Sequence, residues 1–216
     1  MRRGAAVACA LALGIGLAAT PRDAHAQGEW TVWAGVTGAS AVVRTLTPGG
    51  ENVLRGTLFG GEGGLRVGPV AVAAGYAEGT ARPERTGANS ATGVDAYVKL
   101  ALRPLPGLEI TFAPTARAWI TSVATQRVVS WASGMRYEHT LGAPWISAFG
   151  TLWAVLAGNA GAAAFAGGRG GAAGLRVQAG AWALGVRYAI DETRFSADPL
   201  RQTVEELQLT LQAGLR

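Results

Sequence analysis

The last segment of the chain alternates strictly between two kinds of residue. From Glu206 to Arg216, every odd-numbered position is apolar, and every even-numbered position is polar, charged or glycine. Successive side chains of a β-strand point to opposite faces, whereas a helix repeats its faces about every 3.6 residues. The segment is therefore predicted to be a strand with one apolar and one polar face. The same alternation runs through 94–103, 108–120 and 184–190, so we expect an all-β fold.

The pattern predicts ten strands joined by connections of alternating length. The expected strands are 29–43, 55–67, 70–79, 92–103, 108–120, 127–139, 145–157, 169–178, 182–190 and 204–216. Short turns are expected at 68–69, 104–107, 141–144 and 179–181, and longer loops at 44–54, 80–91, 121–126, 158–168 and 191–203. Bacterial outer-membrane barrels alternate short periplasmic turns with longer outside loops in this way. We predict an up-and-down antiparallel transmembrane β-barrel of about ten strands, with eight as the alternative and both termini at the periplasmic end.

A separate segment precedes the predicted barrel. Arg2 and Arg3 form a basic start, the run 5–19 is apolar, and Ala24-His25-Ala26 matches the small-x-small pattern that signal peptidase cleaves. Residues 1–26 are therefore interpreted as a signal peptide, and residues 27–216 as the barrel. The only cysteine, Cys9, leaves with the signal, so no disulfide is expected in the exported protein.

Two other folds compete with the membrane barrel. A soluble lipocalin-like ligand-binding barrel would alternate equally well, but it would normally carry Lys and Glu across its outer surface. Here Lys99 is the only lysine, and charged residues make up 15% of the chain. The uncharged run 141–168 is long enough for a membrane-spanning helix, but Pro144 and Gly158 interrupt it. These observations favour the membrane barrel.

The chain also resembles a known family. The signal ending Ala24-His25-Ala26, the glycine-rich alternating strands and the closing run 207–211 are similar to small bacterial outer-membrane β-barrels of the OmpA, OmpX and opacity-protein type. This resemblance implies a location in the cell outer membrane, in contact with lipid and lipopolysaccharide. It also implies assembly by periplasmic chaperones and the barrel-insertion machinery. The chain departs from the family at its end, Gly214-Leu215-Arg216, where such barrels usually carry an aromatic residue.

The polar face of each strand is assigned to the lumen. The basic lumen residues are then Arg66, Lys99, Arg103, Arg117, Arg136, Arg176, Arg187 and Arg216, and the acidic ones are Glu62, Asp95, Glu109, Glu138 and Glu206. Small residues are expected between them at Ala71, Ala73, Gly75, Ala101, Ala113, Ala132, Gly134, Ala183 and Gly185. Buried charges persist when they are paired or hydrated. A cross-strand salt-bridge network with some positive excess is expected, either filling the barrel or lining an ion pathway.

Aromatic residues near the predicted strand ends suggest two belts at the membrane interfaces. One belt, on the periplasmic side, is expected from Trp30, Trp145 and Trp182. The other is expected from Tyr76, Trp119, Trp131, Trp153 and Tyr188.

No catalytic, cofactor or metal site is predicted. His139 is the only histidine after the signal, and its neighbour Glu138 should point to the opposite face of the strand. The glycine run 60–64 is expected inside a strand, whereas a phosphate-binding loop needs a helix after it. Basic residues are scattered singly, which argues against nucleic acid as a partner. No oligomeric state is predicted.

The expected function is a non-enzymatic outer-membrane barrel with a structural or narrow-channel role. The alternative is an adhesion or recognition protein that acts through its surface loops, and a lipid-modifying barrel enzyme is less favoured.

Overall fold

The computed structural model describes residues 30–84, 90–122, 125–161, 164–196 and 200–215. The predicted signal peptide, 1–26, and the predicted lumen residue Arg216 lie outside them. The strands are β1 (Trp30–Thr47), β2 (Gly50–Val67), β3 (Val70–Pro83), β4 (Ala91–Leu105), β5 (Leu108–Ile120), β6 (Thr125–Thr140), β7 (Ile146–Asn159), β8 (Phe165–Ala179), β9 (Trp182–Phe195) and β10 (Arg201–Leu215).

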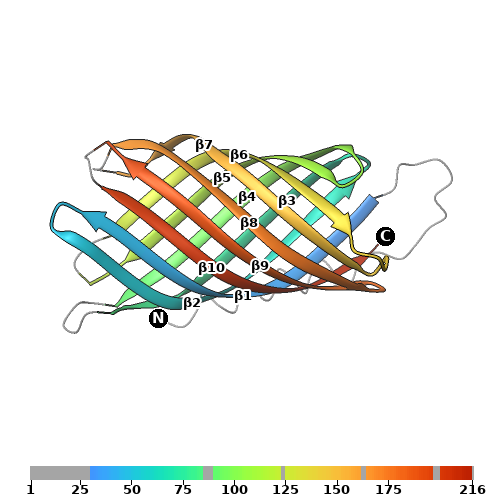
Figure 1. Ribbon diagram of the computed structural model, residues 1–216, viewed down its shortest axis with the longest axis horizontal. Helices are drawn as coiled ribbons and strands as arrows, with labels where there is room; N and C mark the ends of the chain where they lie inside the picture. Colours follow the sequence, from blue (N-terminus) through green and yellow to red (C-terminus); the bar gives the residue numbers. More distant parts are fainter. Residues whose placement is uncertain (1–29, 85–89, 123–124, 162–163, 197–199, 216) are drawn as a thin grey trace.

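The ten strands form one closed antiparallel barrel (Figure 1). Each strand pairs with its neighbours in sequence, and β1 closes the ring by pairing with β10. The predicted up-and-down barrel of ten strands is therefore confirmed, and the eight-stranded alternative is wrong. The start of β1 lies beside the end of β10, because Val32 pairs with Leu215.

The two ends of the barrel differ in their connections. We call the end where β1 begins the turn end, and its connections are 68–69, 106–107, 141–145 and 180–181. The opposite end, here the loop end, has connections at 48–49, 84–90, 121–124, 160–164 and 196–200.

The loop-end connections are shorter than predicted, because the strands continue into all five expected loops. Residues 44–47 and 50–54 belong to β1 and β2, which leaves only 48–49 between them. Both faces of the strands are polar near this end, as the outward ion pairs Arg44–Glu205 and Arg169–Glu192 illustrate. Because both faces are polar near the loop end, apolar and polar residues no longer alternate along the sequence there. The pattern therefore predicted loops where the strands in fact continue.

The barrel has an apolar exterior and an interior of small and polar residues. Leu209 and Leu152 on the outside are 58% and 66% exposed, whereas Ala101 and Ala73 on the inside are 0% and 4% exposed. The large apolar side chains thus face away from the molecule, as expected of a surface in contact with lipid. Among the residues described, no helix is long and apolar enough to cross a membrane; the run 141–168 contains β7 and the start of β8 instead.

Glycines make room for aromatic rings on the inner wall. In each case the aromatic residue pairs with a glycine of the neighbouring strand, and a Cβ on that glycine would collide with the ring. The pairs are Trp33–Gly64, Tyr97–Gly75, Trp119–Gly93, Phe149–Gly174 and Trp153–Gly170. A ring lying flat over a glycine lets a large side chain occupy the lumen without spreading the strands.

The two-faced wall gives a direct test on β10. Replacing Leu209 with Arg should lower the free energy of unfolding by roughly 2–4 kcal/mol, because the charge would enter the apolar face of a membrane-spanning strand. Urea unfolding of the protein in lipid vesicles measures this change.

Cysteine labelling tests the facing itself. A lipid-restricted thiol probe should react with Leu209→Cys and spare its neighbour Gln208→Cys, whose native side chain is bonded to Arg187 and Thr37 inside the barrel. Reaction at position 208 and not at 209 would reverse the assignment of the two faces.

Candidate functional site

A cavity of about 970 Å³ occupies the barrel interior. The twelve described charged residues that the sequence assigned to the lumen all lie on its wall: Glu62, Arg66, Asp95, Lys99, Arg103, Glu109, Arg117, Arg136, Glu138, Arg176, Arg187 and Glu206. The small residues predicted between them line it too, except Gly75, which the ring of Tyr97 covers. Asp191, which the sequence placed in a loop, is a further lining residue.

Arg117 crosses the lumen. It extends from β5, and its guanidinium lies 2.7 Å from Oδ2 of Asp95 on β4 and 3.1 Å from Oδ2 of Asp191 on β9. Its Nη2 is also 3.7 Å from Oε1 of Glu206 on β10, the strand opposite β5 in the ring. One cation therefore joins both walls of the barrel through three carboxylates.

Two further polar groups lie between this network and the turn end. Tyr97 and Gln212 both donate hydrogen bonds to Glu62, which links β4, β2 and β10. Arg187 donates to Oε1 of Gln208 at 3.1 Å, and its guanidinium lies 5.8 Å from the ring centroid of Trp153. These contacts span neighbouring and next-nearest strands, so they stiffen the wall more than they block the lumen.

At the turn end, cations outnumber carboxylates. Glu109 is only 6% exposed and faces three cations, with Arg66 at 2.9 Å, Arg103 at 3.5 Å and Lys99 at 3.7 Å. Glu138 on β6 pairs with Arg136 at 2.9 Å and accepts a hydrogen bond from Ser147 at 2.6 Å.

Arg176 on β8 completes this turn-end group. Its described hydrogen bond, at 3.1 Å, is to the amide oxygen of Gln178 and not to a carboxylate.

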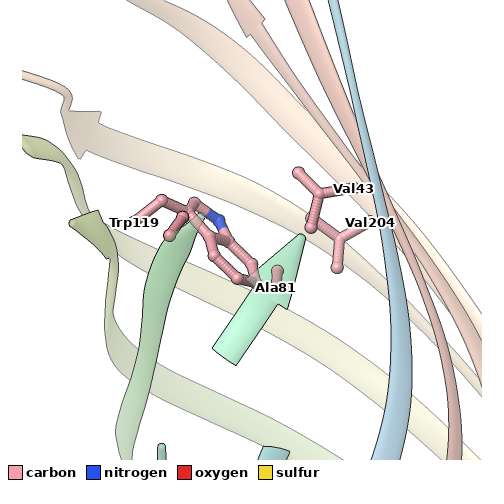
Figure 2. Packing of buried hydrophobic residues seen from close by; sticks show 5 residues of the cluster. Val43, Ala81, Trp119 and Val204 are labelled. Carbon is pink, nitrogen blue, oxygen red and sulfur yellow. The ribbon is translucent and has the colours of Figure 1, made fainter. Parts of the chain in front are cut away.

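An apolar cluster lies at the loop end, beyond the Arg117 network. Figure 2 shows the indole of Trp119 extending over Ala81 toward Val43 and Val204, which belong to the other side of the ring. Trp119 is 6% exposed, and Ala91 and Leu54 complete this cap. Nearby, the amide of Gln202, 4% exposed, donates to Gln126 across the barrel at 3.1 Å. None of the cap residues lines the main cavity, although Gln202 and Thr193 at this end do, and the cavity reaches the turn end at Gly180 and Leu215.

Two of the eight predicted belt residues face inward. Trp119 lies in the cap, and Trp153 lines the cavity and donates from Nε1 to Asp191 at 3.3 Å. These two residues were assigned to the belt from their positions along the strands. Trp119, however, is two residues from Arg117, and side chains two residues apart on a strand point to the same face. The other six are at least 40% exposed on the outside: Trp30, Tyr76, Trp131, Trp145, Trp182 and Tyr188.

The sequence reasoning also missed three inward aromatic residues, Trp33, Tyr97 and Phe149, all of which line the cavity. Their parity along β1, β4 and β7 would have indicated this.

The residues considered in the sequence as catalytic or phosphate-binding candidates do not form a site. His139 is exposed on the outside of β6, while Glu138 points into the lumen. The glycine run 60–64 lies within β2, which continues to Val67 and then into a turn. Within the described ranges, no group of three or more His, Cys, Asp and Glu side chains is arranged to hold a metal ion.

Comparison with known proteins finds similarity in the fold only. No family model matches the chain, and neither does any curated protein sequence. The outer membrane protease OmpT from Escherichia coli has a TM-score of 0.50 at 7% identity, with 91% of this chain and 99% of that one covered. Neisserial surface protein A gives 0.38 at 11% identity over 88% and 99% of the chains, and the transport unit of the Escherichia coli autotransporter AIDA-I gives 0.43 at 11% over 97% of each.

At such low identity, the likeness to the protease describes a barrel architecture and carries no residue roles. What the lumen can do follows from its own contacts: a charge network joins its walls, an apolar cap lies at the loop end, and the turn end is cationic.

Removal of Arg117 tests the importance of the lumen network. Arg117→Met should destabilise the barrel by about 3 kcal/mol, because three carboxylates would face the lumen without their shared cation. Arg169→Met is the matched control: its side chain is 69% exposed in a 3.8 Å outward pair with Glu192, and loss of such a pair costs at most about 1 kcal/mol. Equal losses of unfolding free energy in the two variants would contradict a structural role for Arg117.

Proposed function

We propose that the chain is a non-enzymatic integral protein of the bacterial outer membrane, with a structural role and at most a narrow conducting path. The observation that carries this proposal is the double obstruction of the lumen, by Arg117 bridging opposite strands and by the cap around Trp119. Eight-stranded barrels are just filled by side chains, whereas barrels of sixteen strands or more hold an aqueous channel. A ten-stranded barrel lies nearer to the first case, and Arg117 and the cap narrow an interior that holds a cavity of about 970 Å³.

The exterior supports a membrane location. Its apolar side chains would contact lipid, and the exposed Trp30, Trp145 and Trp182 at the turn end suit a headgroup region. With the predicted N-terminal signal peptide, this favours the outer membrane, with lipid and lipopolysaccharide as surroundings. Periplasmic chaperones and the barrel-insertion machinery are the proposed partners in assembly. Cell fractionation with a heat-modifiability gel tests the location, because a closed barrel migrates faster until it is boiled in SDS.

The alternative adhesion role has less support. The longest connection at the loop end spans 84–90, so little chain is available beyond the strands to form a recognition surface. A lipid-modifying activity has less support as well, because His139 is exposed on the outside of the barrel and faces away from Glu138.

Conductance in a planar bilayer tests the obstruction. The protein should show no openings, or openings far smaller than those of a porin. Trp119→Ala should raise the conductance severalfold, because it removes the one large side chain that spans the cap. Ion selectivity should be weak, since the described lumen holds seven cations and six carboxylates in total.

Trp131→Ala is the matched control for this measurement. Trp131 is 46% exposed on the outer face of β6, so its loss should leave the conductance unchanged. A large conductance in the unmodified protein, or an equal effect of the two tryptophan variants, would refute the obstruction.

A further inference from the structure

Charge is distributed unevenly along the lumen. Arg66, Lys99, Arg103, Arg136 and Arg176 gather at the turn end around only two carboxylates, Glu109 and Glu138. Nearer the loop end the balance reverses, since Arg117 alone serves three carboxylates. An even distribution of cations and carboxylates along the lumen would make each level neutral, and the lumen of this barrel is not arranged in that way.

Three of these five cations, together with both carboxylates, line a smaller space at the mouth. A second cavity of about 330 Å³ lies at the turn-end mouth, and its wall carries three cations, Arg103, Arg136 and Arg176, and two carboxylates, Glu109 and Glu138, beside Ser147 and Gln178. Such a volume holds several non-hydrogen atoms together with water. The space is therefore large enough for a small anion that touches more than one guanidinium.

Two guanidinium groups at this end have unused hydrogen-bonding capacity. Nη1 of Arg66 and Nε of Arg176 are buried and have no hydrogen-bond partner among the described residues. A buried donor without a partner is costly, and a donor on a cation costs more than a neutral one. Arg176 has the carboxylates of Glu138 and Glu62 as neighbours of opposite charge and the guanidinium groups of Arg136 and Arg103 as neighbours of like charge. Because Arg176 lines the second cavity and Arg66 does not, an anion there would supply the bond that Arg176 lacks.

We infer that the turn-end mouth is a binding site for a soluble, multivalent oxyanion that carries phosphate or carboxylate groups. Planar guanidinium groups bind such oxygens with two parallel hydrogen bonds. The carboxylates around Arg117 repel an anion that moves farther in, and the cap lies beyond them, so the ligand is held at the mouth and not conducted. Entry from the periplasm rests on the proposed outer-membrane location and on the prediction that both chain termini, and with them the turn end, face the periplasm.

Titration calorimetry with pyrophosphate tests the site in detergent micelles, where neither orientation nor conductance matters. The protein should bind pyrophosphate, and the affinity should fall as salt is raised. Arg176→Gln should weaken binding about tenfold, and this variant leaves no ion-paired carboxylate behind, because the described bond of Arg176 is to Gln178. Absence of binding at millimolar pyrophosphate would overturn the inference.

Arg127→Gln is the charge-matched control. Arg127 lies exposed on the outer face of β6 near the loop end, so its loss should leave the affinity unchanged although the net charge falls equally. Retention of heat-modifiable migration shows that both variants are folded. Equal weakening in the two variants would mean that pyrophosphate responds to overall charge only, which also refutes the site.

Nanodiscs distinguish a soluble anion from a lipid headgroup. Pyrophosphate should bind with similar affinity in zwitterionic discs and in discs containing phosphatidylglycerol. A lipid phosphate in the mouth would instead lower the affinity for pyrophosphate strongly in the anionic discs, and Arg176→Gln would remove this difference between the two kinds of disc. That result would overturn the assignment to a soluble ligand. A large conductance, in contrast, would refute the obstruction proposed above and leave this binding result standing.

Discussion

The structure depends on the pairing of β1 with β10. Backbone N–H and C=O groups cannot remain unpaired in the hydrocarbon region of a bilayer, and only a closed ring of strands satisfies them all. This pairing runs from Val32 opposite Leu215 to Leu46 opposite Arg201, almost the full length of both strands. Closure fixes two surfaces at once, because alternate side chains must then face either the surroundings or a lumen of fixed width.

A lumen of fixed width has to be filled without pushing the strands apart. The inner wall meets this requirement with alanines and glycines, and with aromatic rings that each lie over a glycine of the next strand, as Trp119 does over Gly93. The small residues in turn leave space for long side chains to reach across. Arg117 can reach carboxylates on β4, β9 and β10 because the inner wall around it carries small side chains. The abundance of glycine thus serves interior packing as well as turns.

Much of this architecture was predictable from the two-residue period, and the errors have specific causes. The period identified ten strands and the facing of the lumen charges, because a strand that separates lipid from a polar interior must alternate. It failed for Trp119 and Trp153, where position along the strand was used in place of parity, and for Asp191, where polar residues on both faces concealed the strand. Contacts such as Arg117 with Glu206 could not be predicted, since they depend on the barrel's diameter and on strands distant in sequence.

The same lumen carries opposite charge imbalances at two levels, with carboxylates in excess around Arg117 and cations in excess at the turn end. Around Arg117, opposite charges meet within 4 Å from several strands, and their mutual attraction holds the walls together at the level where the cap also packs. At the turn end, Glu109 is shared among three cations and Arg176 has no described carboxylate partner. A network built only for rigidity would place a carboxylate within ion-pair distance of Arg176 as well, because like charges at close range weaken the fold they belong to. The arrangement at the mouth lowers the stability of the empty barrel and favours an incoming anion, which is the expected signature of a binding site placed at one end of a structural network.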